Sequence, residues 1–195
     1  MRGVPRVSED HLTARREQIL AAARACFLRN GLHNTSMQDL IQEAGLSVGA
    51  VYRYFKSKND IISAISETVA GSLATHLDEV AADGTLDLAT AMERVVDILD
   101  DQLGDFPLAV QVWSEAVLDP AIGDIVRQRY LRLREPLHTI AERAITRGEL
   151  PAGADVGAVS AVLFGMIPGY ALQRQLVGDP DRDTYLAGVR ALLAR

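Results

Sequence analysis

Cysteine and aromatic residues are scarce in this chain of 195 residues, which holds one cysteine and 5% aromatic residues. A single cysteine, Cys26, excludes an intramolecular disulfide and suits a reducing compartment. Because Cys26 lies beside Phe27 in a helical pattern, we interpret it as a small core side chain rather than a redox sensor. The first twenty residues carry arginines and no apolar segment, so we expect no secretory signal and a cytoplasmic protein.

The motifs of several enzyme classes are also missing. The sequence has no GxGxxG or Walker-type phosphate loop, no nucleophile elbow, and no histidine or cysteine cluster with metal-ligand spacing. Its four histidines are scattered along the chain. We therefore expect a protein that is not an enzyme and that uses no cofactor or metal.

Strand patterns are absent too, whereas apolar residues recur at helical spacing along most of the chain. Caps, glycines and prolines divide the pattern into nine predicted helices, so the predicted fold is all-α with an antiparallel bundle as its main body. The first helix is expected at 9–30, and the next three are expected to open at Ser36, Ser47 and Ser57. The other expected ranges are 86–101, a short helix from 106, 120–148, 155–176 and 181–194.

The stretch 44–58 predicts a tight turn followed by a short helix. Gly45 suits the left-handed position after a helix, and Ser47 is a good N-cap for the next one. Val51 and Phe55 are four residues apart, so they share an inward face. Gly49, Ala50 and Arg53 point the other way, while Val48, Tyr52 and Tyr54 lie on the flanks. A face with such small residues can enter a DNA major groove.

Charge is distributed unevenly along the chain. The net charge is −6, but residues 1–60 carry nine Lys/Arg against six Asp/Glu, and residues 61–195 carry eleven against twenty. Both lysines of the chain, Lys56 and Lys58, directly follow the short helix. Positive charge therefore concentrates where nucleic acid would bind.

These residues resemble a known family. The run Val-Tyr-Arg-Tyr-Phe-Lys-Ser-Lys at 51–58, preceded by a short helix and Ala-Gly-Leu-Ser at 44–47, is similar to the recognition helix of TetR-family transcriptional regulators. The resemblance covers roughly residues 12–62, and 106–170 is most similar to the BetI-like branch. It implies a helix-turn-helix DNA-binding domain at 1–57, with a tail at 1–8, and a ligand-binding and dimerisation domain at 58–195.

The resemblance and the residue chemistry together indicate a set of DNA contacts. Val48, Gly49 and Ala50 are expected to approach bases, and Arg53 to read a guanine or a phosphate. Gln38 is either a base contact or a solvated surface residue, and the tail is either disordered or a basic arm for the minor groove. Helix ends, hydroxyls and lysines are expected to hold the DNA backbone. These backbone contacts are Thr35, Ser36, Ser47, Tyr52, Tyr54, Lys56 and Lys58.

Between Val156 and Gln173 the chain has no charged residue for 18 positions. That length suits a membrane span, but its glycines and alanines make it only modestly hydrophobic. We instead expect a helix buried on all sides, partly by a second subunit. The prediction is a homodimer through the last two helices, helped by the close approach that Gly165 and Gly169 permit, and binding to a palindromic operator.

The facing apolar stripes of the C-terminal helices can pack a core or line a ligand pocket. Bulky aromatics beside small residues, and the polar atoms of Trp113 and Tyr170, favour a pocket. The expected effector is small, mainly apolar, and neutral or cationic, because lysine is absent from this part of the chain. The candidate pocket residues are Leu73, Leu77, Val96, Val110, Trp113, Val117, Tyr130, Leu163, Met166, Ile167 and Tyr170.

The function that these features predict is a ligand-responsive transcriptional regulator, most simply a repressor that its effector releases from DNA. A TetR-like activator is one alternative. Another is a small-molecule-binding or protein-interaction module that does not act through DNA. The two lysines after the short helix argue against this last class, because a disused DNA surface has no reason to hold them.

Overall fold

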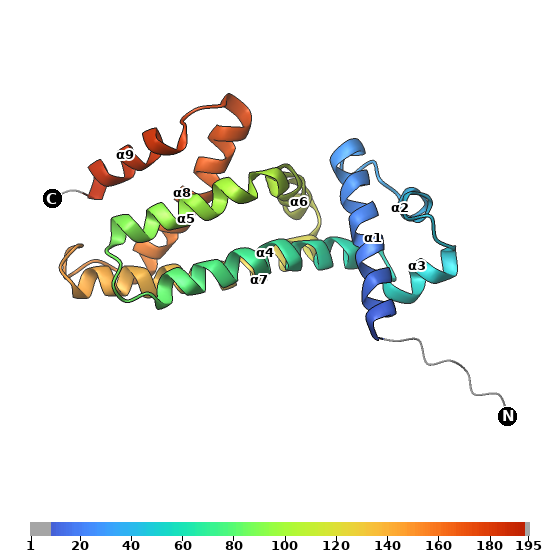
Figure 1. The fold of residues 1–195 in the computed structure, drawn as a ribbon, viewed down its shortest axis with the longest axis horizontal. Coiled ribbons are helices and arrows are strands. Elements are labelled where there is room, and N and C mark those ends of the chain that lie inside the picture. The colour runs from blue at the N-terminus through green and yellow to red at the C-terminus, as the bar shows by residue number, and fades with distance from the viewer. Residues whose placement is uncertain (1–8, 194–195) are drawn as a thin grey trace. The chain divides into compact units, whose positions relative to one another are not determined.

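The protein is described by a computed structural model over residues 9–193, and the predicted tail at 1–8 lies outside the described residues. The described part is helical and contains no strand, which confirms the predicted all-α class (Figure 1). One 3₁₀ turn, Leu103–Asp105, precedes α6. The helices are α1 (Glu9–Asn30), α2 (Met37–Ala44), α3 (Val48–Tyr54), α4 (Lys58–Ala82), α5 (Leu88–Gln102), α6 (Phe106–Leu118), α7 (Pro120–Thr146), α8 (Val156–Val177) and α9 (Arg182–Leu193).

Local capping explains where several of these helices begin and end. Asp87 and Asp155 each accept a hydrogen bond from the backbone N–H three residues on, and α5 and α8 begin at the next residue. Helix α7 ends at Thr146, slightly before the predicted end, because Gly148 takes a left-handed conformation with φ of 73°. Short polar side chains and glycines therefore set the boundaries, as the sequence pattern predicts.

Contacts divide the chain into two compact units. The first unit comprises Met1–Ser66 with Leu108–Ile125, and the second comprises Glu67–Pro107 with Val126–Arg195. Most of α6 and the first turn of α7 therefore belong with α1, α2 and α3. Units defined by contacts need not coincide with functional domains, so the predicted domains 1–57 and 58–195 stay a prediction.

The first unit has a core drawn from all three N-terminal helices. Ile19 and Phe27 of α1, Leu40 of α2 and Val51 of α3 are fully buried. In the same unit, Leu108 and Val112 of α6 and Ile122 of α7 are also buried. The inward position predicted for Val51 of α3 is thus confirmed.

The second unit has one apolar core to which α4, α5, α7, α8 and α9 contribute. Polar groups at its edge are paired: the Tyr170 hydroxyl donates to Asp100 Oδ1 at 2.7 Å, and the Tyr185 hydroxyl donates to the Met166 carbonyl at 2.9 Å. Arg143 of α7 donates to the Ala81 carbonyl, and Arg147, the residue after α7 ends, donates to the Leu86 carbonyl, which holds the α4–α5 connection. Hydrogen bonds therefore fix the rim of a core that apolar packing fills.

Helix α8 is long and apolar enough to cross a membrane by length and composition, with a mean hydropathy of 1.5. One face, with Leu163, Ile167 and Tyr170, is buried in the core of the second unit. Only 33% of the apolar window is buried within the chain, however. Part of α8, including Val162, Gly165 and Leu176, is therefore exposed in its own chain.

We predict that Tyr170 makes stability sensitive to alkaline pH. Burial, followed by the hydrogen bond to Asp100, raises the pKa of Tyr170 to about 12, above the ordinary value of 10. Because the folded pKa is raised, the stabilisation is complete below about pH 10 and is lost as pH rises through about 12. Tyr170→Phe should cost about 1 kcal/mol at neutral pH and make the alkaline loss shallower.

The measurement is the free energy of unfolding by denaturant at several pH values between 8 and 12. Tyr52→Phe is the matched control, because Tyr52 is 38% exposed on α3. An alkaline loss that is equally steep in Tyr170→Phe and in the wild type would contradict the assignment.

Candidate nucleic-acid interface

The start of α2 is held by a reciprocal pair of side chains. The Ser36 hydroxyl oxygen accepts from the Asp39 N–H at 3.3 Å, and Asp39 Oδ2 accepts from the Ser36 N–H at 2.8 Å. These bonds confirm the capping box that the spacing predicts. Bonds from the Ser36 hydroxyl and N–H hold the pKa of Asp39 below its usual value, so its carboxylate remains charged and engaged.

The turn between α2 and α3 has the predicted form. Gly45 is left-handed, with φ of 64°, and its N–H donates to the Gln42 carbonyl at 3.1 Å. The Ser47 hydroxyl oxygen accepts from the Ala50 N–H at 3.3 Å and so caps α3. Val51 and Phe55 point inward and are almost fully buried. A buried inner face leaves the opposite face of α3 free to meet a partner.

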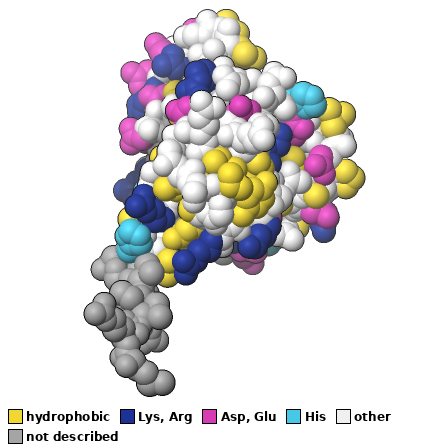
Figure 2. Space-filling view, turned by 90° about the vertical axis from the view of Figure 1, so that its right-hand side faces the viewer, with side chains coloured by type: hydrophobic (Ala, Val, Ile, Leu, Met, Phe, Trp, Pro, Cys, Tyr) yellow, Lys and Arg dark blue, Asp and Glu magenta, His cyan; other side chains and the backbone are white. Residues whose placement is uncertain are grey.

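The outward face of α3 carries small or apolar residues flanked by donors. Val48 is 59% exposed, Gly49 and Arg53 are exposed, and Tyr52 is 38% exposed. Figure 2 views the chain from the side on which α2 and α3 lie in Figure 1, and hydrophobic side chains gather near the centre of that face with Lys and Arg side chains close by. An apolar centre with cationic neighbours suits base edges between two phosphate walls.

Four predicted phosphate contacts donate to partners within the protein. The Ser36 hydroxyl donates to Asp39 Oδ2 at 2.7 Å. The Thr35 side chain is buried, and its hydroxyl donates to the Gly31 carbonyl at 2.7 Å. Lys56 Nζ donates to the Tyr52 carbonyl at 2.7 Å, and Lys58 Nζ donates to the Leu32 carbonyl at 3.0 Å. An ammonium has three donors, so both lysines retain capacity for phosphate. The Thr35 hydroxyl has donated its one proton inside the turn, which differs from the role predicted for it.

Sequence patterns did not indicate two residues that support this surface from α1. Gln18 Nε2 donates to the carbonyl of Ala44, the last residue of α2, at 2.8 Å. The Arg16 guanidinium lies 5.5 Å from the centre of the Phe55 ring, just past the end of α3. Both contacts join residues far apart in sequence, and exposed polar residues in a helix give no local signal of such partners.

Cys26 behaves as the sequence suggests. Its side chain is buried, and burial, the largest cause, raises the pKa of the thiol. A neutral buried thiol is a poor nucleophile. Cys26 therefore acts as a core side chain of the first unit.

The structure brings together eight of the eleven predicted pocket residues. Leu77, Val96, Leu163, Ile167 and Tyr170 belong to the core of the second unit, and Leu73, Tyr130 and Met166 pack against it. Val110, Trp113 and Val117 of α6 belong to the first unit instead. Val117 is 85% exposed, so its predicted place in an apolar pocket wall was wrong. It lies in the last turn of α6, and apolar spacing alone does not show whether a neighbour covers such a residue.

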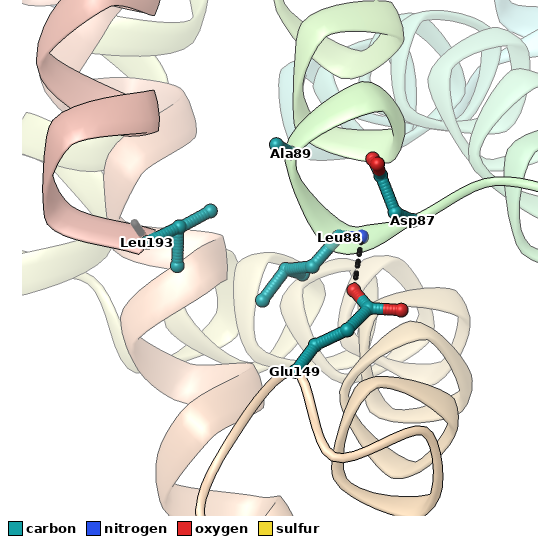
Figure 3. Close-up of a pocket in the computed structure, with 5 residues that line it drawn as sticks. All are labelled: Asp87, Leu88, Ala89, Glu149 and Leu193. Carbon is teal, nitrogen blue, oxygen red and sulfur yellow. Dashed lines mark hydrogen bonds between the residues drawn. The ribbon is translucent and has the colours of Figure 1, made fainter. Parts of the chain in front are cut away.

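A hollow of about 270 Å³ lies at another place in the second unit (Figure 3). It is lined by Asp87, Leu88, Ala89, Glu149 and Leu193, and the Leu88 and Leu193 side chains face each other across it. Glu149 Oε2 accepts from the Leu88 N–H at 2.6 Å. None of these residues was predicted from the sequence, because they come from one helix start, one loop and one helix end.

Comparisons with known proteins agree with this arrangement. A model of the bacterial regulatory proteins of the tetR family matches residues 19–65, and one described as the tetracyclin repressor-like C-terminal domain matches residues 81–191. The chain belongs to the TetR family of transcriptional regulators, whose helix-turn-helix binds DNA. The resemblance to the BetI-like branch stays a prediction.

Individual relatives are also transcriptional regulators by name. The HTH-type transcriptional regulator UidR of Escherichia coli is 23% identical over 91% of this chain and 90% of that protein. An HTH-type transcriptional repressor of Mycobacterium tuberculosis is 38% identical over 65% of this chain and 72% of that protein. The crystal structure of Bacillus subtilis FadR with stearoyl-CoA has a TM-score of 0.76 at 21% identity, covering 91% of this chain and 96% of that chain. These relatives are named as regulators, in agreement with the expectation that this chain is not an enzyme.

Proposed function

We propose that this protein is a ligand-responsive transcriptional repressor that binds a palindromic operator as a homodimer. The observation that carries the proposal is the capped α2–turn–α3 unit, whose outer face exposes Val48, Gly49 and Arg53. A relative that is named as a repressor supports repression over activation. The activator and the module that does not act through DNA remain the alternatives, and the DNA-binding experiments below test the second of them.

In the proposed complex, α3 lies in the major groove. Val48, Gly49 and Ala50 approach bases, with Val48 placed for a thymine methyl, and Arg53 and Gln38 reach base edges or phosphate. Ser36, Ser47, Tyr52, Tyr54, Lys56 and Lys58 hold the backbone through hydroxyl, backbone N–H and ammonium donors.

We predict that Lys56→Ala and Lys58→Ala each weaken binding to every DNA sequence. Each should lower the slope of log affinity against log salt by about one unit, because one phosphate contact is lost. Lys58→Ala should also lower the melting temperature, because the Leu32 carbonyl loses its ammonium donor. Fluorescence anisotropy at several salt concentrations measures the slopes, and a changed sequence preference at unchanged affinity would refute the assignment.

The homodimer rests on apolar surface that the chain does not cover itself. Val162 and Leu176 of α8 are 67% and 78% exposed, and Leu192 of α9 is 83% exposed. A Cβ atom added at Gly165 or Gly169 meets nothing within 4 Å. Two copies of α8 and α9 packed as a four-helix bundle would bury this surface and permit close backbone approach.

We predict that Gly165→Leu separates the dimer without harming the monomer. A Cβ atom added at Gly165 meets nothing within 4 Å in its own chain, so the leucine is expected to act mainly by pushing a partner helix away. The dissociation constant of the dimer should rise at least about tenfold, or about 1.4 kcal/mol. Operator affinity should fall with it.

Gly71→Leu is the matched control, because Gly71 is an exposed glycine of α4 with equally open surroundings. Sedimentation velocity reports the assembly state, and circular dichroism reports helix content. A Gly165→Leu protein that sediments like the wild type would exclude this interface.

The effector is proposed to enter the core of the second unit, among Leu77, Tyr130, Met166 and Ile167. The related fold of FadR was solved with stearoyl-CoA, which supports ligand binding by this architecture. For this chain we propose a mainly apolar, neutral or cationic effector, because its core has apolar walls and its second unit has no lysine.

We predict that effector and operator oppose each other with a coupling free energy of about 1–3 kcal/mol. A thermal-shift screen of neutral and cationic apolar compounds should find one that raises the melting temperature, and stearoyl-CoA serves as the anionic comparison. Calorimetry of that compound with and without operator should give the coupling, because linkage is reciprocal. Equal affinity in both titrations would rule out the switch.

A further inference from the structure

Three polar residues recur at helical spacing at one end of α6, and we call them the α6 polar row: Gln111 and Glu115 within the helix, and Asp119 directly after its end. Each has a partner in the same compact unit, either in the turn between α1 and α2 or in the first turn of α4. Glu115 Oε1 lies 3.5 Å from His33 Nδ1, and Asp119 Oδ2 accepts from Asn59 Nδ2 at 3.5 Å. Gln111 Oε1 accepts from the Leu32 N–H at 2.8 Å.

These three contacts contribute different amounts of stabilisation. The His33 side chain is 86% exposed, so its pair with Glu115 contributes little. The bond between Asp119 and Asn59 is at the upper limit of hydrogen-bond length. The bond from Leu32 to Gln111 is short and partly buried, and breaking it leaves a backbone N–H without a partner. Gln111 is therefore the member of the row that decides the position of the turn.

Leu32 lies at the centre of the α1–α2 turn and is bonded on both sides. Its N–H donates to Gln111 of α6, its carbonyl accepts from Lys58 of α4, and its side chain is 3% exposed. The Thr35 N–H donates to the same carbonyl at 3.4 Å. Ser36, the N-cap of α2, follows four residues later, and the Thr35 N–H bond ties that segment to the Leu32 carbonyl, so the place of Leu32 constrains where α2 starts.

We propose that Gln111 is a positioning residue for DNA binding. Its side-chain carbonyl holds the α1–α2 turn, and with it the start of α2, in the arrangement in which α2 and α3 bind DNA. A change in α6 that breaks this bond frees the turn and lowers DNA affinity. The inference rests on the proposed function, and it assigns the control of DNA affinity to the Gln111 side chain.

The test compares three variants of the full-length chain. Gln111→Met keeps the length of the side chain and removes the acceptor, whereas Gln111→Glu keeps an oxygen that accepts the Leu32 N–H. Gln128→Met is the matched control, since Gln128 is an exposed glutamine of α7 with no role in this contact. The DNA probe is the duplex that the wild-type chain selects from a random pool.

Hydrogen exchange at the Leu32 amide and DNA affinity are the two readouts. Gln111→Met should exchange the Leu32 amide faster and bind the duplex about tenfold more weakly, the size expected when one partly buried hydrogen bond is lost. Gln111→Glu and Gln128→Met should stay close to the wild type in both. If Gln111 only stabilised the fold, Gln111→Met would have a lower melting temperature, but Gln111→Met and Gln111→Glu would bind the duplex with the same affinity.

Two results would overturn the proposal. One is a Gln111→Met protein that binds the duplex as tightly as the wild type. The other is a Gln111→Glu protein that keeps its Leu32 amide protected and still loses as much affinity as Gln111→Met. Failure of the proposed function is distinct from both, because the wild-type chain would then select no DNA, while the exchange rates would still report whether Gln111 holds the turn.

Discussion

The backbone of Leu32 is the constraint on which the DNA-reading unit depends. Its N–H and its carbonyl are both bonded to side chains outside the turn, Gln111 and Lys58, and its own side chain is buried. A buried backbone group must find a partner, so the turn cannot move without giving up one of these bonds. Leu32 therefore links α4, α6 and the start of α2, and a helix-turn-helix that looks local in sequence is completed by a helix 79 residues further along.

The lysines that we propose as phosphate contacts also hold the fold. Lys56 and Lys58 each donate to a backbone carbonyl, and both follow the end of α3 within four residues. A lysine held at one end by the protein loses less side-chain freedom when a phosphate binds it. The acidic remainder of the chain repels DNA and confines the attraction to this surface.

Sequence patterns predicted what short-range chemistry determines. Ser36 with Asp39, Gly45 and Ser47 set helix ends through bonds within five residues, and the structure places them as expected. The partners of Thr35 and Lys58 could not be predicted, because the fold decides whether a hydroxyl or an ammonium meets solvent or a carbonyl. The prediction for Val117 was wrong for a related reason. Apolar spacing identifies one face of a helix but does not show whether a neighbouring element covers that face.

The core of the second unit limits what an effector can be. The Tyr170 hydroxyl, which favoured a pocket in the sequence, already donates to Asp100, and the Tyr185 hydroxyl at the same core donates to the Met166 carbonyl. A ligand that takes the Tyr170 hydroxyl must leave Asp100 without its donor or supply another, and an unpaired group costs about 1–3 kcal/mol. An apolar ligand that displaces side chains such as Leu77 and Ile167 avoids that cost. The effector that we propose would therefore gain most by shape and apolar contact, and it would have to displace side chains of a core that is already packed.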